Sequence, residues 1–437
     1  MPTPPPHPDG RAGLAQSDAL VRARLRHDPD VLKFLAGRVA GEVGSRITRE
    51  GLPIVAILAT GASAQQLGVL GALSMLPALL IGQLAGHVVD RRRRRPVMVA
   101  SELIRAAVLA TIPIAALVHR LTFVQIAVVT VLVAMLQIAY RVADRGYLPF
   151  LVGRDRLEPG NQLMGGADAV GEASGPALMG VLIQTVGGPA AILFDAVSRV
   201  LSAVGLLAVR RVEPPPVPVA PASTEASGFG AGLTIVRRHP QLKWLAYNRV
   251  TESFFSGCFT ALYELYALTT LHLTPLDLGL LITSGGIGSF VASLWVARWR
   301  RRLGLGGVLV ATFALGAATH FLVPLAQGPV VVAFGLLFIA QFVGDLFLTM
   351  FEIEATVLEQ TVTPDHWLGR VEGALQMLNG GAGVVGAVLS GSIAVAIGMR
   401  ETFWMFTAGG MLAAVWLLHP SIRRVGEAVL DPAWFQR

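Results

Sequence analysis

A run of arginines between two long apolar segments constrains this chain more than any other feature. Residues 65–85 and 96–118 are each about as long as a helix that crosses the hydrocarbon core of a bilayer. Between them lies Gly86-His87-Val88-Val89-Asp90, which leads into five consecutive arginines, Arg91 to Arg95. Because adjacent guanidinium groups are excluded from hydrocarbon, the stretch predicts a short loop at a membrane surface. The whole segment therefore predicts a transmembrane helical hairpin.

Composition extends this interpretation to the full chain. Hydrophobic residues make up 53% of the sequence, charged residues only 14%, and the mean hydropathy is +0.61, which together indicate an integral membrane protein. Apolar segments of about 20 residues or more recur along the chain. They lie at residues 31–59, 65–87, 96–118, 122–147, 161–186, 189–209, 243–271, 275–297, 304–326, 329–358, 368–397 and 400–418. We therefore predict an all-α fold with about 12 transmembrane helices.

The distribution of Lys and Arg predicts the orientation of these helices. The N-terminal segment through Lys33 and the loops after every second span, counted with Lys243 and Arg370 at the edges of the next spans, hold 25 of the 35 basic residues, whereas the opposite loops hold only Arg120 and Arg400. Since cytoplasmic loops carry the excess of basic residues, both termini are expected in the cytoplasm. The formal charge of +7 is then explained by membrane topology, and no nucleic-acid partner is expected.

The sequence divides into two similar halves. Residues 210–241 contain Pro214-Pro215-Pro216-Val217-Pro218 and read as a cytoplasmic linker. It separates six-helix bundles expected at 31–209 and 242–419, with a disordered N-terminal tail at 1–30 and a C-terminal tail at 420–437. Residues 165–171 match residues 380–386 at five of seven positions, which indicates an internal repeat. Parallel six-helix repeats with a binding site between them are one architecture of secondary transporters.

Charged residues inside the predicted spans outline a candidate site. Arg38, Glu42, Arg46 and Glu50 recur at every fourth position and share one helical face, with Arg49 beside them. Because a charge at the bilayer centre costs about 2.5–3.5 kcal/mol, such a face is expected to line a polar cavity. A purely structural role in packing remains the alternative. The other cavity candidates are Arg145, Asp168, Glu172, Glu252, Glu264 and Asp345.

A carboxylate that carries a proton must lie at membrane depth, where its charge is costly. Glu42, Glu50, Glu172, Glu264 and Asp345 meet this requirement. Two further charge pairs are interpreted as supporting ion pairs because their members are three or four residues apart on a helix. These are Glu102 with Arg105, and Asp195 with Arg199.

Catalytic and metal-binding patterns are not expected. Cys258 is the single cysteine, and the histidines form no paired-ligand spacing. No nucleophile, base and oxyanion set occurs together, so an enzyme is not predicted. Gly381-x-Gly383-x-x-Gly386 fits a dinucleotide-binding pattern, but it lies in an apolar helix where glycines allow close helix packing. We expect no cofactor and no metal, with a proton gradient as the energy source.

The loop motif resembles the signature of the major facilitator superfamily. Gly86-x-x-x-Asp90-Arg91-x-x-Arg94-Arg95 is similar to the family's motif between helices two and three. Arg93 departs from the glycine or aspartate that is usual at its position. The resemblance implies that Asp90 pairs across the cytoplasmic face with the start of helix eleven and with neighbouring arginines, and so locks the outward-open state.

A second motif indicates the direction of transport. Gly171-x-x-x-Gly175-Pro176-x-x-x-Gly180 looks like the superfamily's antiporter motif, which is linked to exporters. The segments at 141–160 and 360–371 resemble the subgroup that holds macrolide-efflux proteins and the enterobactin exporter. This resemblance implies a drug:proton antiporter.

The resulting hypothesis is a proton-coupled exporter of small amphipathic compounds, such as drugs or siderophore-like metabolites, that works by rocker-switch alternating access. Uptake or lipid transport on the same fold, and a membrane sensor without transport activity, are the alternatives. The expected partners are membrane lipid, a small-molecule substrate and protons, and the chain is expected to be a monomer in the cell inner membrane.

Overall fold

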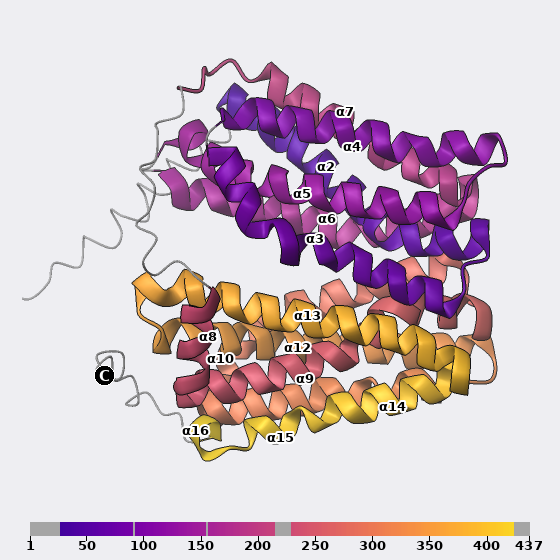
Figure 1. The fold of residues 1–437 in the computed structure, drawn as a ribbon, viewed down its shortest axis with the longest axis vertical. Helices are drawn as coiled ribbons and strands as arrows, with labels where there is room; N and C mark the ends of the chain where they lie inside the picture. The colour runs from indigo at the N-terminus through magenta and orange to yellow at the C-terminus, as the bar shows by residue number, and fades with distance from the viewer. Residues whose placement is uncertain (1–26, 91, 154–155, 215–228, 424–437) are drawn as a thin grey trace, which may run out of the picture.

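The computed structural model describes residues 27–90, 92–153, 156–214 and 229–423. Residues 81–90 and 229 are described by their backbone alone. All the regular structure in these ranges is helical, which confirms the predicted all-α class. The helices form two groups that lie one above the other in Figure 1.

The first group contains six long helices. They are α2 (Pro29–Thr60), α3 (Ala64–Asp90), α4 (Arg94–Leu117), α5 (Phe123–Val152), α6 (Leu157–Val186) and α7 (Gly188–Ala208). We call this group the first bundle. The hairpin expected from the arginine run is present, because α3 and α4 are separated by three residues.

The second group begins in the predicted linker. It contains α8 (Phe229–Arg238), α9 (Pro240–Leu265), the π-helical turn η3 (Tyr266–Thr270), α10 (Pro275–Thr319), α11 (Leu322–Leu325), α12 (Val330–Val362), α13 (Asp365–Ile397), α14 (Met399–Leu412), α15 (Ala414–Leu417) and α16 (Pro420–Arg423). We call α9 to α15 the second bundle. The linker thus contains a ten-residue helix, α8, which packs on α13 and α9.

Helix α10 covers two predicted spans. Its backbone leaves the helical region at Gly304, where φ is 69° and ψ is 169°. Glycine suits this point because L side chains rarely adopt positive φ. In the described part of the chain, six helical stretches are long and apolar enough to cross a membrane: α4, α5, α7, α10 with α11, α12 and α13. Helix α2, which carries the charged face predicted to line a cavity, is not among them.

Helix contacts show that the two bundles repeat each other. In the first bundle α2 packs on α6 and α7, and in the second bundle α9 packs on α13 and α14. Between bundles, α3 packs on α13 and α6 packs on α10. The second helix of each half therefore meets the fifth helix of the other, which is the arrangement that a pseudo-two-fold axis produces.

Glycines bring the two bundles together at one end of the molecule. A methyl group built on Gly180 of α6 would lie 2.6 Å from the carbonyl oxygen of Pro275 in α10. One built on Gly391 of α13 would lie 2.6 Å from the carbonyl oxygen of Ala64 in α3. We call this end the far end, and the end at which α2 begins and α7 ends the linker end. The bundles are closed against each other at the far end.

Candidate transport site

Three adjoining cavities run through the space between and within the bundles. The central cavity has a volume of ≈ 430 Å³ and takes its walls from α2, α3, α4, α5, α7 and α9. The second-bundle cavity (≈ 390 Å³) shares Arg49, Glu50 and Glu264 with it, and the linker-end cavity (≈ 620 Å³) shares Gln137 and Arg141. These volumes fall in the range of small-molecule sites. The shared walls make one polar path.

The charged ladder on α2 lies along this path. Arg38, Glu42 and Arg46 line the linker-end cavity, whereas Arg49 and Glu50 line both the central and the second-bundle cavities. The ladder therefore faces the molecule's interior, as its four-residue period predicted.

Most charges of the ladder are paired with residues of the first bundle. Arg38 contacts Asp144 at 2.5 Å and Asp168 at 3.0 Å. Arg46 donates a hydrogen bond of 2.8 Å to Glu172. These contacts join α2 to α5 and α6, so the paired charges also hold the first bundle together. Arg49 and Glu50, adjacent on α2, lie 2.6 Å apart.

The cavity carboxylates of the second bundle have no such cations, although Glu352 and Glu359 of α12 pair with Arg249 of α9. Glu264 and Asp345 line the second-bundle cavity, and neither forms an ion pair with a described residue. Asp345 accepts a hydrogen bond of 2.8 Å from Gln341, and one oxygen of Glu264 is buried without a hydrogen bond. Glu252 also lacks an ion pair among the described residues and lines small inner pockets with Phe255 and His320. It lies away from the central cavity.

Arg141 and Asp144, which stand out as charges in an apolar span, lie on α5 and line the linker-end cavity together with Arg145. Three residues of the path were not proposed from the sequence. Gln137 of α5 lines the linker-end cavity, and Tyr263 and Gln341 line the second-bundle cavity. They carry no sequence signal that separates a cavity wall from helix packing.

Both predicted supporting ion pairs are present, and they join into one buried cluster between α4 and α7. The Nε of Arg199 lies 2.8 Å from Asp195, and its Nη1 lies 3.3 Å from Glu102. The same Glu102 lies 3.7 Å from Arg105. Thr48 of α2 donates a hydrogen bond of 2.5 Å to Asp195. All four charged residues are at most 2% exposed. The cluster stabilises the first bundle, but Arg105 and Asp195 also touch the central cavity.

The predicted antiporter motif forms two close helix contacts. A methyl group on Gly171 would lie 2.9 Å from the Cβ of Glu42, and one on Gly175 would overlap the side chain of Arg46. These glycines let α6 approach the charged ladder of α2. Gly180 and the carbonyl of Pro176 meet α10 across the bundle interface. The motif therefore lies where two helices of different bundles touch.

The predicted gating motif is described only in part. Helix α3 extends to Asp90 and includes Gly86, but the side chain of Asp90 is outside the described part of the structure. Arg91 lies outside the described residues altogether. The pairing expected for Asp90 stays a prediction. Arg94 donates a hydrogen bond of 3.0 Å to the carbonyl of Gly146, and Arg95 donates one of 2.7 Å to the carbonyl of Leu207. Both arginines are thus tied to the first bundle.

A polar network fixes the beginning of the linker to this motif. The carboxylate of Glu213 accepts hydrogen bonds of 2.8 and 3.0 Å from the backbone N–H groups of Arg94 and Arg95. It therefore caps the N-terminus of α4, where negative charge is favoured. We call residues 210–213 the strap.

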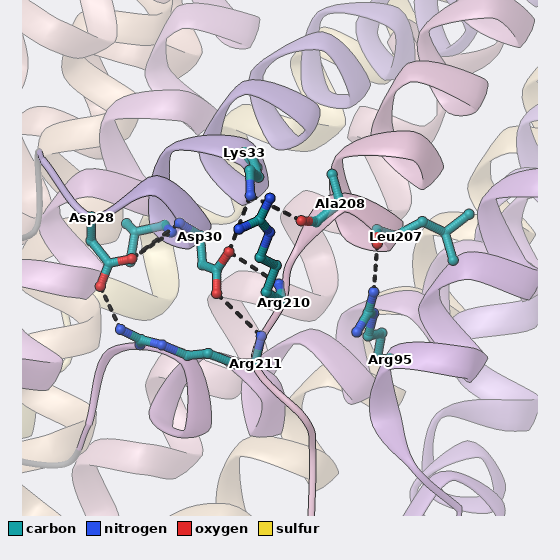
Figure 2. A network of polar contacts seen from close by, with 9 residues as sticks. Asp28, Asp30, Lys33, Arg95, Leu207, Ala208, Arg210 and Arg211 are labelled. Carbon is teal, nitrogen blue, oxygen red and sulfur yellow. Dashed lines mark hydrogen bonds and ion pairs between the residues drawn. The ribbon is translucent and has the colours of Figure 1, made fainter.

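The strap also contacts the start of α2 (Figure 2). Asp30 accepts hydrogen bonds of 3.0 and 3.2 Å from the backbone N–H groups of Arg210 and Arg211. The first of these is the main reason why the pKa of the Asp30 carboxyl lies below its ordinary value. The guanidinium of Arg211 contacts Asp28 at 2.5 Å, and Lys33 reaches the carbonyl of Ala208 at 3.0 Å.

Together these features define a class of protein. Two pseudo-equivalent helical bundles closed at one end, with a charged path between them, form the architecture of a secondary transporter that works by alternating access.

In the described part of the chain, no three His, Cys, Asp or Glu side chains lie close enough to hold a metal ion.

Comparison with known proteins places the chain in a family. It matches the model of the Major Facilitator Superfamily over residues 51–344 and 249–431, and it belongs to this family of transporters. It is 28% identical over 399 residues to the multidrug efflux pump Tap of Mycolicibacterium fortuitum, which covers 89% of this chain and 95% of that protein. The corresponding pump of Mycobacterium tuberculosis is 27% identical over 371 residues, covering 81% of this chain and 85% of that protein.

Solved structures agree on the fold. A bacterial homologue of the iron transporter ferroportin in its inward-facing state has a TM-score of 0.72 at 18% identity, covering 90% of this chain and 98% of that chain. The outward-facing state of a bacterial ferroportin homologue scores 0.55, also at 18% identity, and covers 89% and 98%. The nucleoside transporter NupG scores 0.70 at 14% identity, covering 93% and 100%.

Proposed function

We propose that this transporter exports small amphipathic compounds, such as drugs, in exchange for protons. Its relatives from Mycolicibacterium fortuitum and Mycobacterium tuberculosis are both named multidrug efflux pump Tap, and they match most of the chain. The resemblance of Gly171 to Gly180 to the antiporter motif supports export over uptake.

Two carboxylates without a cationic partner among the described residues, Glu264 and Asp345, are the observation that supports proton coupling. Both line the second-bundle cavity, and neither has a cationic partner among the described residues. A carboxylate at membrane depth without a cation is the one whose charge a proton most readily neutralises. Glu50 and Glu172 are also at membrane depth, but each has an arginine partner.

Alternating access gives these carboxylates contact with each side of the membrane in turn. We place the linker end in the cytoplasm, since most basic residues lie there, and the chain in the plasma membrane as a monomer. The far end is then the closed outer gate, and the structure is the inward-facing form that takes cargo from the cell. A membrane potential of 100 mV supplies about 2.3 kcal/mol of free energy for each elementary charge that crosses the membrane. This free energy drives the step in which the proton is carried into the cell.

Reconstituted transport tests the proposal. Exported compounds are first identified by a susceptibility panel in an efflux-deficient host, with and without a protonophore. Purified chain is then placed in liposomes with an imposed pH gradient, and flux of an identified compound is measured together with lumenal pH. Export coupled to protons predicts opposite fluxes, with the gradient dissipated when the compound is added. Fluxes in the same direction would indicate uptake symport, and no dependence on the gradient would contradict proton coupling.

Glu264→Gln is the sharpest variant, and Asp277→Asn is its matched control. Asp277 is half-buried, caps the start of α10 through Thr274, and lies outside the three cavities. We expect Glu264→Gln to remove the proton flux and the control to retain it.

A further inference from the structure

We propose that the central cavity recognises a zwitterionic cargo, whose acidic group contacts Arg105 and Arg141 of the first bundle while its basic group contacts Glu264 of the second. The inference rests on the proposed function and names the class of compound that the same site takes. It assigns binding roles to Arg105 and Arg141.

Arg105 is a buried guanidinium without hydrogen bonds to any described residue. It is 1% exposed, and its Nε and Nη1 are buried without a hydrogen-bond partner. Glu102, its nearest carboxylate, is 3.7 Å away and is shared with Arg199. Buried polar groups in folded proteins are nearly always hydrogen-bonded, so a guanidinium in this condition needs an acceptor. Because Arg105 touches the central cavity, that cavity is where the acceptor would lie.

Arg141 adds a second cation to the same wall. It lies on α5, lines the central cavity, and forms no ion pair or hydrogen bond with a described residue. The other arginine of the cavity, Arg49, is paired with Glu50 at 2.6 Å. Arginine is well suited to hold a carboxylate because its planar fork can donate two parallel hydrogen bonds.

The wall contributed by the second bundle carries the opposite charge. Glu264 of α9 lines the central cavity and has one buried oxygen without a hydrogen bond. Asp195, the remaining carboxylate of the cavity, is held by Arg199 at 2.8 Å. Among the described residues of the central cavity, the charges without a hydrogen-bonded partner are thus positive on the first bundle and negative on the second.

A cargo with both charges satisfies both walls at once. A purely cationic compound would leave the buried guanidinium of Arg105 without an acceptor, and a purely anionic one would leave Glu264 without a donor. An unsatisfied buried polar group costs about 1–3 kcal/mol, and more when it is charged. The zwitterion also contacts both bundles at once. Its binding therefore affects the contact between the bundles, which changes during alternating access.

Three related fluorescent probes test this. Norfloxacin carries a carboxylate and a basic amine, its methyl ester keeps only the amine, and its N-acetyl derivative keeps only the carboxylate. Binding of each to the purified full chain is measured by equilibrium dialysis at one pH and salt concentration. We expect norfloxacin to bind about tenfold more tightly than either derivative, since each derivative loses a charge-assisted contact.

Two variants assign the contacts. Arg141→Gln should remove the advantage of norfloxacin over its methyl ester but keep its advantage over the N-acetyl compound. Glu264→Gln should do the reverse. Arg238→Gln is the matched control, because Arg238 is exposed on α8 and lines none of the three cavities. It should leave all three affinities unchanged.

Arg105 is tested by Arg105→Lys, which keeps the charge next to Glu102 but loses the fork. It should weaken norfloxacin binding while the methyl ester binds as before. Equal affinities for the three probes, no binding of any, or preferences that survive Arg141→Gln and Glu264→Gln would overturn the inference. Proton-coupled export of compounds with one charge or none would then still support the proposed function, so the two failures are distinguishable.

Discussion

The two bundles repeat the same helix packing but hold their interiors together differently. In the first bundle, ion pairs link α2 to α5 and α6, and a buried charge cluster links α4 to α7. In the second bundle, Arg249 of α9 also pairs with Glu352 and Glu359 of α12, but aromatic side chains occupy much of the core around α9. Phe259 and Tyr266 both contact Phe403, with ring centroids 5.2 and 5.1 Å apart, and Phe255 contacts Phe406 at 5.6 Å.

This difference separates charges that hold helices together from charges that are available to exchange protons. Asp168 and Glu172 of α6 correspond in the repeat to Gly383 and Ala387 of α13, and both first-bundle carboxylates are paired with arginines of α2. The second bundle lacks that charged contact, and its cavity carboxylates Glu264 and Asp345 have no cationic partner among the described residues. The repeat therefore preserves the places where helices touch, while the chemistry of each interior has diverged.

The strongest test of the comparison is removal of a shared cation from the first bundle. Arg199→Leu leaves Asp195 and Glu102 buried without their closest cation, and we expect a loss of about 3–5 kcal/mol in stability. Thermal unfolding of the purified protein measures it. Arg199→Lys keeps the charge and should lose less. Unchanged stability of the Leu variant would contradict a structural role for the cluster.

Paired and unpaired carboxylates should differ in transport. Glu264→Gln should lower proton-driven flux at least about tenfold, which corresponds to about 1.4 kcal/mol, while counterflow without a gradient continues. Glu172→Gln breaks the contact with Arg46 and should instead lower stability, with counterflow and proton-driven flux falling together. Liposome assays with and without the gradient separate the two. If Glu172→Gln alone uncoupled the fluxes, the assignment would be reversed.

In the second bundle, loss of one ring should have a moderate effect. Phe403 is fully buried between Phe259 and Tyr266, and Phe403→Leu removes both ring contacts while nearly keeping the side-chain volume. We expect a loss of about 1–1.5 kcal/mol, measured by the shift of the unfolding temperature. A loss as large as that of Arg199→Leu would show that the second core is no more tolerant than the first.

The strap predicts the smallest effect. Glu213→Gln keeps the shape of the residue but removes the charge at the N-terminus of α4, at an expected cost of about 0.5–1 kcal/mol. Unfolding of the variant at low and high salt measures it, and the difference from the parent protein should shrink at high salt. An equal difference at both salt concentrations would argue against the electrostatic part of the cap.

The fold could be predicted from the sequence because it follows from length, hydropathy and repetition. Apolar segments of membrane-spanning length gave the helices, and the glycine repeat at 165–171 and 380–386 marked equivalent helices in the two bundles. The four-residue period of Arg38, Glu42, Arg46 and Glu50 placed them on one interior face. These signals are local in the chain, so no knowledge of distant contacts was needed.

Pairing could not be predicted in the same way. Nothing in the sequence shows that Glu172 meets Arg46 while Glu264 meets no cation of the described residues, because such partners lie on helices far apart in the chain. For the same reason the sequence predicted only a local ion pair between Arg105 and Glu102. In the structure, Arg199 of another helix lies closer to Glu102 than Arg105 does. The cap formed by Glu213 had no sequence signal either.

Proton release on cargo binding tests the central claim most directly, namely that the unpaired second-bundle carboxylates exchange protons. An exported compound is added to purified protein in weak buffer, and the released protons are counted with a pH indicator. The account predicts release by the parent protein and by Glu172→Gln, and none by the double variant Glu264→Gln/Asp345→Asn. Undiminished release by the double variant would contradict it.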